Sequence, residues 1–116
     1  MPRRDTPDPF ALAVGQRIQQ LRREANLTLE RLAVESELGS KGHLSNIERG
    51  LVRPTVQTLL VLAQRLNVLP LDLLCFPEDD TRQKLIDATR RMSNAQMKTT
   101  IKAVPAAPSG SRKRSS

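Results

Sequence analysis

The sequence predicts an all-α fold. Apolar residues recur at the three- and four-residue spacing of amphipathic helices, and no segment shows the strict alternation of a strand. Capping residues and Gly or Pro separate these segments. We therefore expect a compact five-helix domain over residues 9–77 and a flexible arm at 1–8 before it. A helical extension at 78–104 and a disordered basic tail at 105–116 should follow.

The first helix is expected to begin at Pro9, because proline fits the first helical position and Asp8 before it is a favoured cap. Asn26 is expected to end it. The apolar side chains of this helix form one stripe, made of Phe10, Val14, Ile18 and Leu21.

A helix, a short turn and a second helix are expected over residues 28–50. Thr28 caps the first of the two, "TLERLAVESEL", without a reciprocal capping box. Gly39 permits a tight reversal, Ser40 caps the following helix and Gly50 ends it. The inward positions of the two helices are Leu32, Ala33, Leu38, Leu44 and Ile47.

Two more helices are expected to complete the domain. Thr55 should cap the fourth helix, and Pro70 should start a short fifth helix that ends near Cys75. The apolar positions of the fourth helix are Leu59, Leu62, Ala63 and Leu66.

The extension carries two further helical patterns. The segment "DDTRQKLIDATRRMS" has acidic residues at its start and arginines at its end, as the helix dipole favours. Ser93 and Gln96 form a capping box for "NAQMKTTIKAV". We expect residues 79–104 to pair two subunits or to dock a partner protein, and folding back on their own domain is the alternative. The apolar side chains left over there are Leu85, Ile86, Met92, Met97, Ile101 and Val104.

Charge favours an anionic partner. The 116 residues carry a net charge of +7 and a pI near 10.8, which favours nucleic acid or an acidic surface. Residues 9–77 hold eight basic and six acidic side chains, a net of +2, whereas residues 78–116 hold nine and four, a net of +5. Most of the excess positive charge therefore lies outside the five-helix domain, and a solvated basic tail alone could account for it.

Several classes of function are not expected. The lone Cys75 excludes a disulfide within the chain and leaves a zinc site without ligands, so it should be a buried, inert thiol. One His, no Tyr or Trp and no clustered acid–base residues argue against an enzyme, and no metal or cofactor is expected. No apolar run reaches the roughly 18 residues of a membrane span. The first ten residues do not resemble a secretory signal, so a soluble, cytoplasmic protein without membrane contact is expected.

Three blocks of sequence resemble one family. In order, "LRREANLTLERLA", "SKGHLSNIERG" and "RPTVQTLLVLAQRLNV" are similar to the Xre/Cro-like, or lambda-repressor-like, helix-turn-helix family across roughly residues 10–75. Two helices joined by a short Gly-containing turn are themselves typical of that motif. The resemblance implies that residues 40–49 form the recognition helix, which lies in the major groove of DNA.

Helical geometry indicates which side chains of the recognition helix face outward. Lys41, Gly42, His43 and Asn46 share the face opposite the two inward positions and are the candidates for contacts with bases. Lys can donate to guanine, Asn can pair with adenine, and His can contact a purine edge. Gly42 has no side chain that could contact a base. The space left there could admit a thymine methyl group or let the helix backbone approach the DNA. Ordinary solvated surface is the alternative for Lys41, His43 and Asn46, and for Gly42 the alternative is a glycine that is merely tolerated in the first turn.

Phosphate contacts are expected from helix N-termini and flexible basic groups. Helix stability alone is the alternative role for the capping hydroxyls, and both roles can coexist. By the resemblance, Arg22 and Glu48 form a structural ion pair that joins the first helix to the third. The phosphate-contacting candidates are Thr28, Ser40, Ser45, Arg49, Arg53 and Thr55.

Two features depart from the family pattern. Many members carry a glutamine immediately after the cap of the second helix, where it reaches phosphate, and Leu29 at this position puts that contact in doubt. The segment from Ala33 to Ser40 is one residue longer than usual. This lengthens the second helix or the turn, and it can change the angle of the recognition helix.

The resemblance implies a sequence-specific transcriptional regulator, bacterial or from a phage, that acts at the nucleoid on double-stranded operator DNA. We expect a repressor that binds a palindromic operator as a homodimer, because one such domain covers about one half-site. The alternative is an antitoxin-type DNA-binding protein whose C-terminal segment binds a partner protein.

Overall fold

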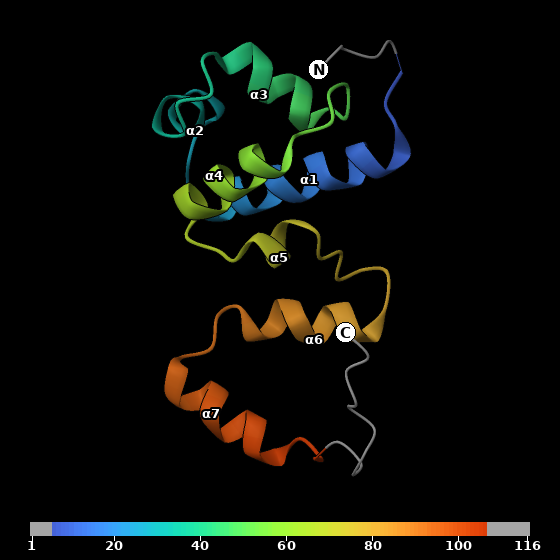
Figure 1. The fold of residues 1–116 in the computed structure, drawn as a ribbon, viewed down its shortest axis with the longest axis vertical. Coiled ribbons are helices and arrows are strands. Elements are labelled where there is room, and N and C mark those ends of the chain that lie inside the picture. Colours follow the sequence, from blue (N-terminus) through green and yellow to red (C-terminus); the bar gives the residue numbers. More distant parts are fainter. Residues whose placement is uncertain (1–5, 107–116) are drawn as a thin grey trace, which may run out of the picture.

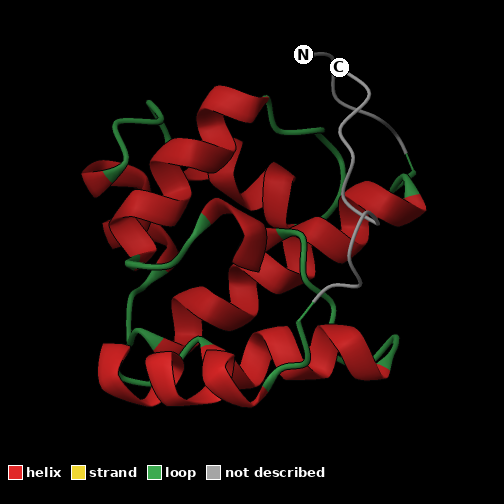
Figure 2. Cartoon of the chain, turned by 60° about the horizontal axis from the view of Figure 1, so that its bottom comes forward, coloured by secondary structure: helices red, strands yellow, loops and turns green. Residues whose placement is uncertain are grey.

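The structure, a computed structural model, describes residues 6–106. Within that range it contains helices and connecting loops and no strand (Figure 2), so the all-α prediction is confirmed. The predicted arm and tail lie outside the described residues except for 6–8 and 105–106. The helices are α1 (Pro9–Glu24), α2 (Leu29–Glu35), α3 (Lys41–Glu48), α4 (Val56–Leu66), α5 (Pro70–Leu73), α6 (Thr81–Thr89) and α7 (Asn94–Ala103).

The helices begin at the predicted caps. The side chains of Asp8, Thr28, Ser40 and Thr55 each accept a hydrogen bond from the backbone N–H three residues later, at 3.0 to 3.1 Å. Each cap satisfies a donor that has no partner within its helix. The capping box that begins α7 is also confirmed, because Ser93 and Gln96 exchange backbone-to-side-chain hydrogen bonds.

The helix before the turn ends earlier than predicted. α2 stops at Glu35 instead of continuing to Leu38, and Glu37 adopts a left-handed conformation with φ of 54°. The amide of Leu38 then donates to the carbonyl of Ala33 at 3.3 Å, which closes a Schellman-type end. The lengthening that we expect for this segment would therefore fall in the turn of residues 36–40 and not in α2. Gly39 completes that turn with φ of 89°.

One core joins α1 to α5. α1 packs against α3 and α5, α2 packs against α3 and α4, and α4 packs against α5. Most of the predicted inward positions are buried, but Phe10 is 61% exposed. It lies in the first turn of α1, where its ring packs edge-on against Phe76 with centroids 6.0 Å apart. The largest fully buried side chains are Ile18, Leu32, Leu44, Ile47, Leu62, Leu73 and Cys75.

Cys75 is a buried thiol at the junction of α5 and α6. It is 2% exposed, and its Sγ donates to the carbonyl of Gln83 at 3.2 Å. The Gln83 side chain in turn accepts from the amide of Phe76 at 2.7 Å. Burial raises the pKa of the Cys75 thiol. The thiol form is therefore favoured, as expected for a structural cysteine.

The two helices of the extension differ in how they relate to the domain. α6 is bound to α1, because Asp87 pairs with Arg17 at 2.7 Å and Arg90 pairs with Glu24 at 3.0 Å. Neither α6 nor α7 contains a buried residue, but within the described residues the side-chain hydrogen bonds of α7 are all local. α7 lies at the end of the molecule opposite α2 and α3 (Figure 1). Residues 79–104 thus fold back on the domain in part, through α6.

Acid should weaken the attachment of α6. Burial by itself would raise the pKa of the Asp87 carboxyl, but the hydrogen bond and charge of Arg17, with Arg90, outweigh it and hold the pKa below its ordinary value. Unfolded Asp has a pKa of about 3.9. The stability that Asp87 contributes is therefore fully present above that pH, and it is lost as the pH falls through the lower folded-state pKa.

The measurement is the melting temperature of the wild type and of Asp87→Asn across the acid range. We expect the melting temperature of Asp87→Asn to be lower than that of the wild type at neutral pH. The difference between the two melting temperatures should narrow below a pH of about 4. A gap of constant size across that range would contradict a charge-based attachment.

Candidate nucleic-acid interface

The outer face of α3 carries side chains with free hydrogen-bonding groups. Lys41 and Gly42 are exposed, and His43 and Asn46 are half-exposed. Within residues 6–106, the side chains of Lys41, His43 and Asn46 form no hydrogen bond or ion pair with the protein. These groups are therefore available to a partner outside the chain. Whether they contact bases stays a prediction.

The inner face of α3 is fixed to the core. Leu44 and Ile47 are completely buried, and they separate the outward side chains from α1 and α2. Because core side chains pack at crystal-like density, this face cannot turn outward without breaking contacts. The orientation of the outer face is therefore set by the fold.

The ion pair that the resemblance implies between Arg22 and Glu48 is present. Arg22 Nε donates to one carboxylate oxygen at 2.7 Å, and its second nitrogen Nη2 donates to the other at 3.1 Å. Its remaining nitrogen, Nη1, donates to the carbonyl of Leu27 at 2.9 Å, and Gln19 donates to the Glu48 carboxylate at 3.4 Å. The side chains of Arg22 and Glu48 are only 10% and 3% exposed. This buried ion pair, with two hydrogen bonds between the guanidinium and the carboxylate, holds the C-terminal end of α3 to α1.

A glycine brings the two helix backbones together at the same place. A Cβ built on Gly15 would collide with the carbonyl oxygens of Ile47 and Glu48, at the last turn of α3. The position of α3 therefore depends on the absence of a side chain at Gly15.

The predicted phosphate contacts come from two kinds of residue. The hydroxyl oxygens of Thr28, Ser40 and Thr55 accept from their own helices. The hydroxyls of Thr28 and Ser40 still have a hydrogen to donate, whereas the Thr55 hydroxyl also shares a hydrogen bond of 3.0 Å with the Thr58 hydroxyl. Arg53 pairs with Asp8 at 3.2 Å. This ion pair is half-exposed, and pairs of this kind contribute little to the stability of the fold. Arg49 is exposed and Ser45 half-exposed, and like the others they remain predictions for phosphate.

Leu29 has a role in packing. Its side chain is partly buried and packs against the core cluster, next to the cap of α2. An aliphatic side chain cannot donate to a phosphate. Leu29 therefore cannot make the phosphate contact that many family members make with a glutamine.

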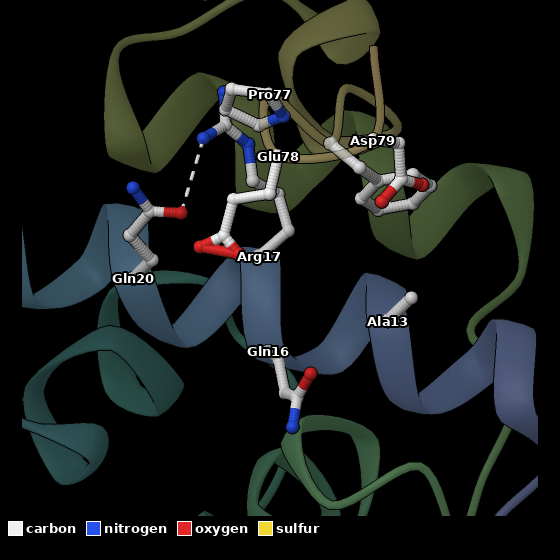
Figure 3. A pocket seen from close by; sticks show the side chains of 8 residues that line it. Ala13, Gln16, Arg17, Gln20, Pro77, Glu78 and Asp79 are labelled. Carbon is white, nitrogen blue, oxygen red and sulfur yellow. Dashed lines mark hydrogen bonds between the residues drawn. The ribbon is translucent and has the colours of Figure 1, made fainter.

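A hollow on the other side of α1 is a less suitable site. It has a volume of about 360 Å³, and Figure 3 shows Arg17 inside it, donating to Gln20 at 3.2 Å. Arg17 also donates to the carbonyl of Asp72 and to Asp87, so the protein itself uses all three of its nitrogens. No group of three or more His, Cys, Asp or Glu side chains among residues 6–106 is arranged to hold a metal ion. The hollow is lined by Ala13, Gln16, Arg17, Gln20, Phe76, Pro77, Glu78 and Asp79.

Two residues that position these elements, Gly15 and Arg17, are not among those predicted from the sequence. Arg17 comes three residues after Val14 and four before Leu21, so helical spacing places it beside the apolar stripe. That spacing was a usable sign of a buried arginine. For Gly15 the only sign was a glycine inside a strongly periodic helix, where it is unfavourable unless something approaches closely.

The comparisons with known proteins agree with this geometry. Residues 13–80 match the family model described as a helix-turn-helix domain. A protein of Sinorhizobium fredii named as an uncharacterized HTH-type transcriptional regulator, y4dJ, is 44% identical over 68 residues, which cover 59% of this chain and 86% of that protein. The crystal structure of the restriction-modification controller protein C.AhdI from Aeromonas hydrophila is similar with a TM-score of 0.55 and 30% identity. That match covers 57% of this chain and 98% of the controller protein. No helix within residues 6–106 is long and apolar enough to cross a membrane.

Proposed function

The chain belongs to the helix-turn-helix domain family and is a DNA-binding regulator of transcription, and we propose that it is a repressor that binds a palindromic operator as a dimer. One observation carries the proposal: α3 is buried and fixed on one face, while the side chains of its other face have no partner within the described chain. A rigid helix with free polar groups is what reading of the major groove requires. The proposed activity is binding without a catalytic step, at the nucleoid of a bacterium or of a phage-infected cell.

The proposed contacts divide into base reading and backbone positioning. Lys41 donates to guanine O6 or N7, Asn46 pairs with adenine, and His43 contacts a purine edge. Backbone contacts fix the register of the protein on the duplex without reading sequence. We assign them to Thr28, Ser40, Ser45, Arg49, Arg53 and Thr55.

Alanine at either base-reading position should weaken specific binding. Lys41→Ala and Asn46→Ala should each cost about 1–3 kcal/mol on the operator and much less on random DNA, because only the operator offers the matched base edges. Both side chains lack partners within residues 6–106, so the melting temperature should not change. Titration of each variant with operator and with random duplex measures this. Equal losses on the two duplexes would instead assign Lys41 and Asn46 to backbone contacts.

Selection of bound sites from random DNA tests the function as a whole. The chain should enrich one sequence with two-fold symmetry, whose half-sites lie about one helical turn apart. A common sequence without symmetry would contradict the dimer, and the lack of any common sequence would contradict sequence-specific regulation.

We further propose that the extension pairs two subunits. Support comes from apolar side chains that its helices leave exposed: Leu85 is 61% exposed, Ile101 65% and Val104 61%. A chain that ends at Met92 keeps α6 on α1 and lacks α7 together with the residues that follow it. This variant should sediment as a monomer and bind the operator without cooperativity. If it stays dimeric, α7 is not needed for pairing and is free for the protein partner of an antitoxin-type regulator.

A further inference from the structure

Gly42 differs from the other glycines among residues 6–106. A Cβ at Gly15 would collide with backbone carbonyls, and a Cβ at Gly50 would lie 2.7 Å from Leu12 Cα. Gly39 has open space but a φ of 89°, where L side chains are strained. Gly42 has an ordinary helical conformation, and an added Cβ would meet nothing closer than the Ser40 hydroxyl at 3.9 Å. Neither packing nor backbone conformation within the described chain accounts for a glycine at this position.

The missing side chain makes α3 less stable. Glycine is up to about 1 kcal/mol less favourable than alanine within a helix, and less than that in the first turn. Alanine would fit at position 42, because its Cβ would make only an ordinary van der Waals contact with the Ser40 hydroxyl. The fold would therefore be at least as stable with a methyl group there, so stability gives no reason for a glycine at position 42.

Gly42 is also in the right place for a close approach. It is the second residue of α3, on the exposed face between Lys41 and the half-exposed His43. Residues in the first turn of a recognition helix are those that come nearest to base edges. A bare position there leaves the helix backbone open between two longer side chains, which is the usual reason for glycine where a ligand meets the backbone.

We propose that Gly42 is a specificity-determining residue whose open space receives the C5-methyl group of a thymine. The methyl group is the apolar feature of the major groove, and it needs an apolar surface with room for it. The Cα of Gly42 supplies that surface, and a Cβ would occupy the same volume. This inference rests on the proposed function, because it requires that α3 lie in the major groove of a specific site.

The test is Gly42→Ala, measured on the sequence that the wild type selects from random DNA. The variant should melt at the same temperature or higher, while its affinity for that sequence falls about tenfold or more. Binding to random duplex should not change. Replacing the thymines of the site one at a time with uracil, which lacks the methyl group, should restore the affinity of Gly42→Ala at one position in each half-site.

Three outcomes would overturn the proposal. Equal affinity of wild type and Gly42→Ala for the selected sequence would show that nothing approaches Gly42. A loss that no uracil restores would exclude the thymine methyl. A lower melting temperature would show that Gly42 has a role in the fold. These results differ from failure of the proposed function, in which the wild type itself selects no common sequence.

Discussion

Glu48→Ala is expected to lower the free energy of unfolding by about 3–5 kcal/mol, because it leaves the buried guanidinium of Arg22 without its carboxylate. Arg22 is itself only 10% exposed, so water cannot fully replace the lost partner. DNA affinity should fall as well, since the same pair holds the last turn of α3 against α1. Thermal and urea unfolding, with operator titration on the folded fraction, measure both effects.

A matched control comes from an exposed ion pair. Arg31 and Glu35 pair at 2.6 Å on the surface of α2, with side chains 68% and 35% exposed. Pairs of this kind contribute about 0.3–0.5 kcal/mol. Glu35→Ala should therefore have little effect on melting. If Glu48→Ala changed the melting temperature as little as Glu35→Ala, the buried Arg22–Glu48 ion pair would not be a determinant of stability.

Gly15→Ala is expected to have the second largest effect. The new methyl group would collide with two backbone carbonyls at the end of α3, and backbone cannot move aside as the tip of a flexible side chain can. Overpacking of this kind costs about 1–3 kcal/mol, occasionally more. Because relief requires α3 to move away from α1, operator affinity should also fall in the molecules that remain folded.

Gly42→Ala serves as the control for Gly15→Ala. Both changes add one methyl group to a helical glycine, but only Gly15 has carbonyls within the space that the methyl needs. The melting temperature should therefore fall for Gly15→Ala, and it should stay equal or rise for Gly42→Ala. Parallel changes in melting at the two positions would mean that helix propensity, and not the contact between α1 and α3, decides stability there.

The features predicted correctly from helical patterns are those that depend on neighbours in the chain, whereas the distant Arg22–Glu48 pair was predicted from the family resemblance. Caps such as Asp8 and Thr28 act on the amide three residues later, and buried positions such as Leu44 and Ile47 follow helical spacing. The early end of α2 was missed because the left-handed conformation of Glu37 is unusual for that residue type. The burial of Gly15 and Arg17 depends on α3, α5 and α6, which are distant in sequence. No local pattern reports such contacts fully.

The two arginines of α1 limit how the length of that helix can change. Arg22 binds Glu48 of α3, whereas Arg17 binds the carbonyl of Asp72 and the carboxylate of Asp87 on the other side. At 3.6 residues per turn, positions five apart differ by about 140° around the axis. One residue inserted between them would turn one arginine by about 100° relative to the other, so only one of the two sets of bonds could form. Insertions and deletions in α1 should therefore be far less tolerated than in the turn of residues 36–40.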